Sequence, residues 1–319
     1  MDSGRNCKPL DGKLGWEPGR CGGVKGEMNI LPSIIMAFTI CVTGVGAASS
    51  FAAPATQPAR ELEQQCDALL ERWQERLTDE RMAVVVSPPF VVAGDGGPQR
   101  VERYVAHTIR AATEALQRGF FDRKPVEPVL ILLFESAEPY NRLTRAWLGD
   151  TNVSPYGYFR RDGVMVMNVG TGTGTLVHEL VHALIKPDFP DVPDWFNEGL
   201  GSLFEQCTLA GGTIRGLPNW RLPALQRAIR ADRLRPLSEL IEDRHFYAEG
   251  RVGLNYAQSR YLLLYLQEKE LLQRFYSLFR EQSAEDQTGL KTLRELIEPA
   301  SMDGFEDQWR KWVLQLRFD

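Results

Sequence analysis

The chain has 319 residues, of which 43% are hydrophobic and 25% charged, a balance that is ordinary for a soluble globular protein with a full core. Its net charge is −5, and it has no long run of Lys or Arg and no interleaving of basic with aromatic residues. These features exclude nucleic acid as an expected partner. The length fits one unit built from two subdomains.

The N-terminal region has the pattern of an export leader. An apolar stretch over residues 30–48 is followed by small residues that suit signal-peptide cleavage. We therefore interpret residues 28–53 as a signal peptide, with Met28 as the start and residues 1–27 as an upstream extension. The alternative is an uncleaved membrane anchor, because the stretch approaches the roughly 20 residues that span a bilayer. We expect an exported protein, periplasmic or secreted, with membrane contact only if the leader is uncleaved.

Two cysteines, Cys66 and Cys207, lie beyond the leader. In an oxidising compartment they can pair, and the alternative is two separate buried thiols. Neither has a histidine nearby in sequence, so neither is a predicted nucleophile.

Residues 54–60 are a flexible linker, and residues 61–175 form a predicted α/β subdomain. We expect helices over residues 61–77, 101–117 and 140–148, strands over 82–87, 90–93 and 128–134, and a hairpin of 156–161 with 163–169.

Residues 176–319 are predicted to be almost wholly helical. Helices are expected from residue 175 and over 195–207, 222–230, 256–268, 271–281, 290–297 and 304–316. A sheet layer followed by a helical half predicts an α+β fold class.

The helix that opens this second half carries the pattern His178-Glu179-Leu-Val-His182. Residues four apart lie on one helix face, so both imidazoles can bind one metal ion. Glu179 lies about 100° round from His178 and can reach a metal-bound water as a general base. The rest of the helix is apolar, and buried histidines in such surroundings need partners.

A second helix is expected to supply the third ligand. The link from Lys186 to Pro193 ends the first helix, and Asp191 or Asp194 is the predicted cap of the next. Glu198 then falls in the first turns, where it completes a two-His, one-Glu set that leaves a fourth position for water. The alternative is an exposed carboxylate that offsets the helix dipole.

These segments, with Trp195-Phe-Asn-Glu198-Gly-Leu, resemble the gluzincins, the clan of thermolysin-like and aminopeptidase-N-like zinc peptidases. The resemblance covers roughly residues 84–316 and is greatest to the compact, bacterial peptidase-MA-like domain. It implies that His178, His182 and Glu198 bind one Zn²⁺ per chain, and that Glu179 is base and then proton donor.

The resemblance also implies two features of substrate binding. The strand Val164–Val169 would be an edge strand on which a peptide adds as a further strand. Tyr256 would donate to the tetrahedral oxyanion, with His245 and Tyr247 as substitutes. The alternative for Tyr256 is a core aromatic, because it shares helical spacing with leucines.

The chain departs from the gluzincin pattern at two places. Ser202 stands where thermolysin-like enzymes have an aspartate that orients a ligand histidine, which leaves that support in doubt. The stretch before the metal helix, residues 169–175, is a Gly-Thr run rather than an acidic segment that anchors a substrate amino group. Endopeptidase cleavage is therefore preferred over aminopeptidase activity, and the run is expected to form the turn and cap that open the helix.

The predicted function is zinc-dependent hydrolysis of a peptide or protein substrate. One alternative is a non-catalytic peptide-binding or assembly protein on the same fold. A second is a metal-free hydrolase in which His182 serves a Ser or Cys nucleophile, but no Gly-x-Ser-x-Gly segment supports it. No feature of the sequence predicts an oligomeric state.

Overall fold

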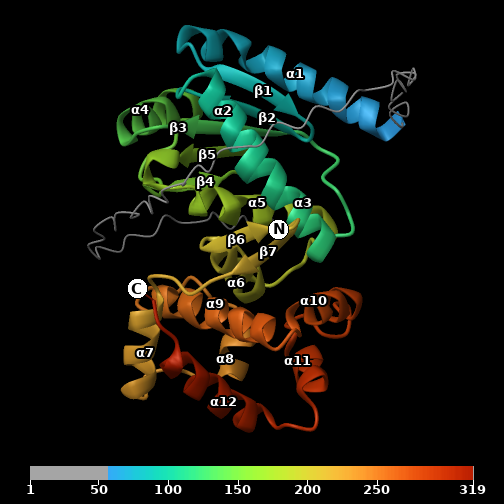
Figure 1. Cartoon of the computed structure of the whole chain (residues 1–319), viewed down its shortest axis with the longest axis vertical. Helices are drawn as coiled ribbons and strands as arrows, with labels where there is room; N and C mark the ends of the chain where they lie inside the picture. The colour runs from blue at the N-terminus through green and yellow to red at the C-terminus, as the bar shows by residue number, and fades with distance from the viewer. Residues whose placement is uncertain (1–56, 319) are drawn as a thin grey trace, which may run out of the picture. The chain divides into compact units, whose positions relative to one another are not determined.

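A five-stranded mixed sheet forms the first half of the described chain. The computed structural model describes residues 57–318, and the strand order is β1-β2-β3-β5-β4 (Figure 1). The inner pairings, β2 with β3 and β3 with β5, are parallel, whereas the outer pairings are antiparallel. The strands are β1 (Ala83–Ser87), β2 (Phe90–Gly94), β3 (Val129–Phe134), β4 (Gly157–Phe159) and β5 (Val164–Asn168).

The strands confirm the predictions made from the periodicity of the apolar residues. Every residue of β3 is buried, because helices cover both faces of this inner parallel strand. The two predicted hairpins also form, with Ser87 opposite Phe90 in β1–β2 and Tyr158 opposite Val166 in β4–β5.

The prediction that Val164–Val169 is an edge strand is wrong. β5 pairs with β3 on one side and with β4 on the other, because the hairpin places β4 over its open side. The edge strand on this side of the sheet is β4, and it contacts the helix that carries the His-Glu-x-x-His pattern.

Helices pack on both faces of the sheet. Alternate residues of the inner strands point to opposite faces and are apolar, so both faces must be covered. One face binds α1 and α4 through side chains such as Trp73 and Tyr140, and the other binds α5 and the helical segment before β3 through Leu116 and Leu180. The predicted helix over 101–117 is continuous but contains a π-helical turn. These elements are α1 (Gln57–Asp79), α2 (Pro98–Tyr104), the π-helix η1 (Val105–Arg110), α3 (Ala111–Gly119), α4 (Ala137–Leu148), the 3₁₀ turn η2 (Val169–Thr171) and α5 (Gly174–Asp188).

The second half is helical, with one exception that the sequence analysis missed. A two-stranded hairpin turns at Gly211 and Gly212, which both have positive φ angles, as tight hairpin turns require. A short helix, α8, was also not predicted. The elements are α6 (Asp194–Phe204), β6 (Cys207–Ala210), β7 (Thr213–Gly216), α7 (Leu222–Arg230), α8 (Leu237–Ile241), α9 (Val252–Glu268), α10 (Leu272–Glu281), α11 (Leu290–Ile297) and α12 (Met302–Gln315).

The link between α5 and α6 is shorter than expected. α5 continues through Pro187 to Asp188, whose carboxylate is held by hydrogen bonds from α10 and from the backbone of Arg123. Pro193 is the N-cap residue of α6, so the predicted cap by Asp191 or Asp194 is wrong. The predicted turn before α5 forms, but its N-cap residue, Thr173, makes no side-chain capping bond.

Cys66 and Cys207 are both free thiols. Cys66 lies in the core on the α1 face of the sheet, whereas Cys207 packs against the core on the opposite side. Burial raises the pKa of each thiol to about 11, so neither is a ready nucleophile.

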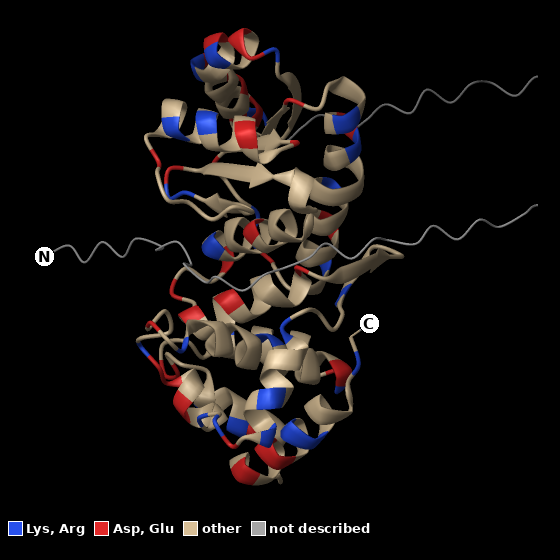
Figure 2. Ribbon diagram, turned by 90° about the vertical axis from the view of Figure 1, so that its left-hand side faces the viewer, with Lys and Arg blue, Asp and Glu red and all other residues tan. Residues whose placement is uncertain are grey.

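Acidic and basic residues alternate along the helices of the ribbon in Figure 2. Among the described residues, no helix has the length and apolar character needed to cross a membrane. The leader predicted for residues 28–53 and the extension before it lie outside the described residues.

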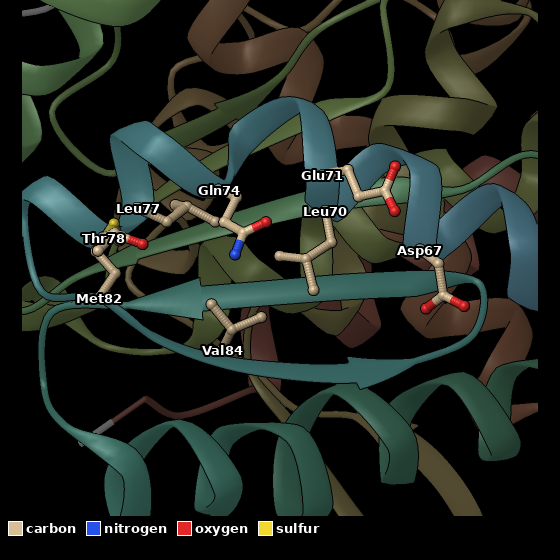
Figure 3. A pocket seen from close by; sticks show the side chains of 8 residues that line it. All are labelled: Asp67, Leu70, Glu71, Gln74, Leu77, Thr78, Met82 and Val84. Atoms are coloured by element: carbon tan, nitrogen blue, oxygen red, sulfur yellow. The ribbon is translucent and has the colours of Figure 1, made fainter.

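A surface hollow lies between α1 and β1, and its walls are visible in Figure 3. Its lining contains no histidine or cysteine, and α1 covers the opposite face of the sheet from α5. The hollow therefore does not belong to the predicted metal site. The lining residues are Asp67, Leu70, Glu71, Gln74, Leu77, Thr78, Met82 and Val84.

Candidate metal centre

Helix α5 presents His178 and His182 side by side. Their ring centroids are 4.7 Å apart with an interplanar angle of 78°, as expected for residues one helical turn apart. His178 is buried and His182 is partly buried, because neighbouring side chains of α5 pack into the core.

Helix α6 brings Glu198 to the two rings. Its Oε2 lies 3.3 Å from Nε2 of His178 and 3.7 Å from Nε2 of His182. The close packing depends on Gly201, because a Cβ there would lie 2.9 Å from Nε2 of His178. Gly199 allows close packing on the other side of α6, where a Cβ would lie 3.0 Å from Ser259 in α9.

These three side chains could hold a metal ion. One potential ligand atom from each lies within 4.8 Å of the others. Donor atoms at the corners of a tetrahedron with zinc-like bond lengths are about 3.3 Å apart, and the distances of 3.3 and 3.7 Å from Oε2 of Glu198 to the two Nε2 atoms fit this spacing. Two imidazoles and one carboxylate are also a donor set that zinc accepts.

Both imidazoles are oriented from behind by hydrogen-bond acceptors. Nδ1 of His178 lies 3.1 Å from Oε1 of Glu205, and Nδ1 of His182 lies 2.9 Å from Oδ1 of Asn197. The carboxylate and amide oxygens are acceptors, so Nδ1 of each ring can donate to them, and Nε2 of each ring is the atom that faces the shared site. With Nδ1 engaged in this way, Nε2 is the nitrogen that would bind a metal ion.

Glu205 therefore orients a ligand histidine, which is the role that thermolysin-like enzymes give to an aspartate at the position of Ser202. Ser202 is fully buried, and its hydroxyl has no hydrogen-bond partner in the described part of the chain. Glu205 follows Glu198 by seven residues, which is close to two helical turns, so both face the histidines.

Glu205 is itself held by Arg221, from the segment after β7. Nη2 of Arg221 lies 3.0 and 3.2 Å from the two carboxylate oxygens. Burial would raise the pKa of Glu205, but the charge of Arg221 and the hydrogen bond from His178 lower it to about 2. Glu205 is therefore a carboxylate near neutral pH, as an acceptor for Nδ1–H must be.

Glu179 lies on α5 between the two histidines in sequence and is partly buried. Burial raises its pKa above the usual value, although the two histidines oppose this effect. A carboxylate with a raised pKa is a stronger base than one with the usual pKa.

Two tyrosines converge on Glu198. Tyr256, in α9, is 8% exposed, and burial and the charge and hydrogen bond of Glu198 raise its pKa well above the usual value. The hydroxyl of Tyr247 donates to Oε1 of Glu198 at 2.6 Å. The ring of His245 is exposed, and no hydrogen bond joins it to these side chains in the part of the chain that the structure describes.

A comparison with protein-family models finds no match, and a search of curated proteins finds no significantly similar sequence. The assignment of the site therefore rests on the geometry and chemistry of these side chains.

The sequence analysis missed Asn197, Glu205 and Arg221. The seven-residue spacing of Glu205 from Glu198 was a usable signal, because it places both on one helix face. Asn197 could have been suspected as a polar residue next to a ligand. Arg221 had no local signal, since β6 and β7 separate it from the helix that it supports.

Proposed function

We propose that the chain is a zinc-dependent endopeptidase in which Glu179 is the general base. The observation that carries the proposal is the convergence of His178, His182 and Glu198, with Nδ1 of each imidazole beside an acceptor oxygen and Nε2 facing the site. A purely structural zinc site is usually closed by four protein ligands, whereas three ligands beside a spare carboxylate favour catalysis.

Zinc held by these three side chains would supply Lewis-acid activation of water and stabilisation of developing negative charge. Glu179 would accept the proton of the attacking water and return it to the amine that leaves. Its raised pKa, which burial causes, supports this role. Tyr256 lies near enough to Glu198 for that carboxylate to raise its pKa, and we assign its hydroxyl to the oxyanion of the tetrahedral intermediate.

We assign the substrate-binding edge to β4. Its outer side ends the sheet, and the strand contacts α5, so an extended peptide added there would run beside the helix that carries the site. The export leader predicted for residues 28–53 supports an exported location for the reaction.

Replacement of Glu179 by Gln tests the proposal. The variant removes the base but keeps the size of the side chain, so turnover of an unstructured protein should fall by about 10²–10⁴-fold while zinc affinity is kept. Glu114→Gln, on the exposed face of α3, is the matched control and should hydrolyse like the wild type.

Unchanged turnover in Glu179→Gln would overturn the assignment of the base. A wild-type chain that binds zinc but hydrolyses no peptide bond would instead favour the non-catalytic peptide-binding protein.

A further inference from the structure

The two oxygens of the Glu198 carboxylate have different partners. Oε2 faces the Nε2 atoms of His178 and His182 at 3.3 and 3.7 Å. Oε1 instead accepts a hydrogen bond from the hydroxyl of Tyr247 at 2.6 Å. One oxygen is thus engaged by the protein, and the other is directed at the metal site.

Tyr247 reaches Glu198 from a loop that is anchored in the core. Phe246 is fully buried, and its ring lies 5.3 Å from the rings of both Tyr247 and Tyr256. Nδ2 of Asn255, in α9, donates to the carbonyl oxygen of Phe246. The hydroxyl of Tyr247 is therefore held in place although 40% of the residue is exposed.

A polar network fixes the start of the same loop. Arg235 forms an ion pair with Asp243 and donates to Oδ1 of Asn255 at 2.9 Å. The other carboxylate oxygen of Asp243 accepts from the backbone nitrogen of His245 at 2.7 Å. These bonds hold the loop in place before any metal ion binds. Less conformational entropy is therefore lost when the hydroxyl of Tyr247 donates to Glu198.

We propose that Tyr247 is a positioning residue, which engages Oε1 of Glu198 and leaves Oε2 alone to bind the metal. The inference rests on the proposed function, because it concerns the same metal site. Hydrogen bonds to a carboxylate are roughly twice as strong as neutral ones. Without the hydroxyl both oxygens can turn to the ion, and the second would occupy the position that a catalytic site keeps open.

This role differs from the one assigned to Tyr256. Tyr256 approaches Glu198 from α9 in the interior, whereas Tyr247 approaches from the exposed loop. Loss of the Tyr247 hydroxyl should therefore change how the metal is bound, and loss of the Tyr256 hydroxyl should change turnover.

Metal binding by Tyr247→Phe tests the inference, with Zn²⁺ and Co²⁺ as probes of the metal-free protein. We expect about a tenfold loss of Zn²⁺ affinity in competition with a chelator, the effect typical of removing a partner of a metal ligand. The visible absorption of the Co²⁺ form should also change, because it reports the number and arrangement of ligands. Tyr265→Phe is the control, since Tyr265 lies in α9 and packs against Phe305 and Trp312.

Wild-type Zn²⁺ affinity and an unchanged Co²⁺ spectrum in Tyr247→Phe would overturn the inference while leaving the proposed function intact. Failure of the wild-type chain to bind either metal would overturn both. If the variant shifts as expected but the wild type hydrolyses no peptide bond, the positioning role stands and only the catalytic proposal falls. A cooperative thermal unfolding transition in the variant shows that it folds, so that a change in metal binding can be assigned to the lost hydroxyl.

Discussion

Single residues behind the ligands decide how the histidines are presented. Glu205 accepts from Nδ1 of His178 and is held in turn by Arg221. Without this acceptor the ring could rotate or change tautomer, and Nε2 would no longer point at the site.

Glu205→Gln should therefore weaken zinc binding by about 10- to 100-fold. The variant keeps one acceptor oxygen but loses the negative charge that holds both His178 and Arg221. Ser202→Ala is the control, because its hydroxyl has no hydrogen-bond partner among residues 57–318, and it should bind zinc like the wild type. Chelator competition measures both affinities, and equal affinities in the two variants would show that Glu205 does not orient the ligand.

The three metal ligands could be predicted from a local sequence pattern, whereas the contact of Tyr247 could not. His178, His182 and Glu198 converge as their spacing predicts, because one helix turn and one short link determine their positions. The contact of Tyr247 with Glu198 depends on a loop fixed by Arg235, Phe246 and other residues distant from α6 in sequence. No local pattern of the sequence indicates such a contact.

At the scale of elements, the end of α5 is tied to α10 by a buried carboxylate. Asp188 is 3% exposed and accepts hydrogen bonds from Tyr276, Arg280 and the backbone nitrogen of Arg123. Burial would raise its pKa, but these donors lower it below the usual value.

Asp188→Asn should cost about 1.5–3 kcal/mol of unfolding free energy at pH 7, since it removes the negative charge that accepts hydrogen bonds from Tyr276 and Arg280 at a buried position. Asp122→Asn is the control. Asp122 pairs with the same arginine, but its side chain is 76% exposed, so the loss should stay below about 1 kcal/mol.

The pH dependence of this effect follows from the lowered pKa. The stabilisation by Asp188 is present above its unfolded-state pKa of about 3.9 and is lost as the pH falls through the folded-state pKa. Urea unfolding should therefore show the difference between wild type and Asp188→Asn shrinking below about pH 4. A difference that is constant down to pH 2 would contradict the lowered pKa.

Most elements could be predicted because their apolar residues repeat with the period of a strand or a helix. The predicted edge strand was wrong because its own hairpin partner, β4, pairs with its open side. The β6–β7 hairpin was missed because its strands are only four residues long, although Gly211-Gly212 is a recognisable turn signal.

For the whole molecule, the α+β class followed from the order of the patterns, with sheet segments first and helices after. The described chain confirms this order, and the candidate site forms where α5, at the border of the two halves, meets α6 and the loop before α9. The sequence could place α5 at this border, but the loop reaches Glu198 only through tertiary packing.

The zinc content of the purified chain is the most direct test of the central claim. We expect one zinc per chain in the wild type, and loss or strong weakening of binding in Glu198→Ala, because two histidines alone leave the ligand set incomplete. A wild-type chain without zinc after exposure to the ion, or a Glu198→Ala variant that keeps it fully, would contradict the account.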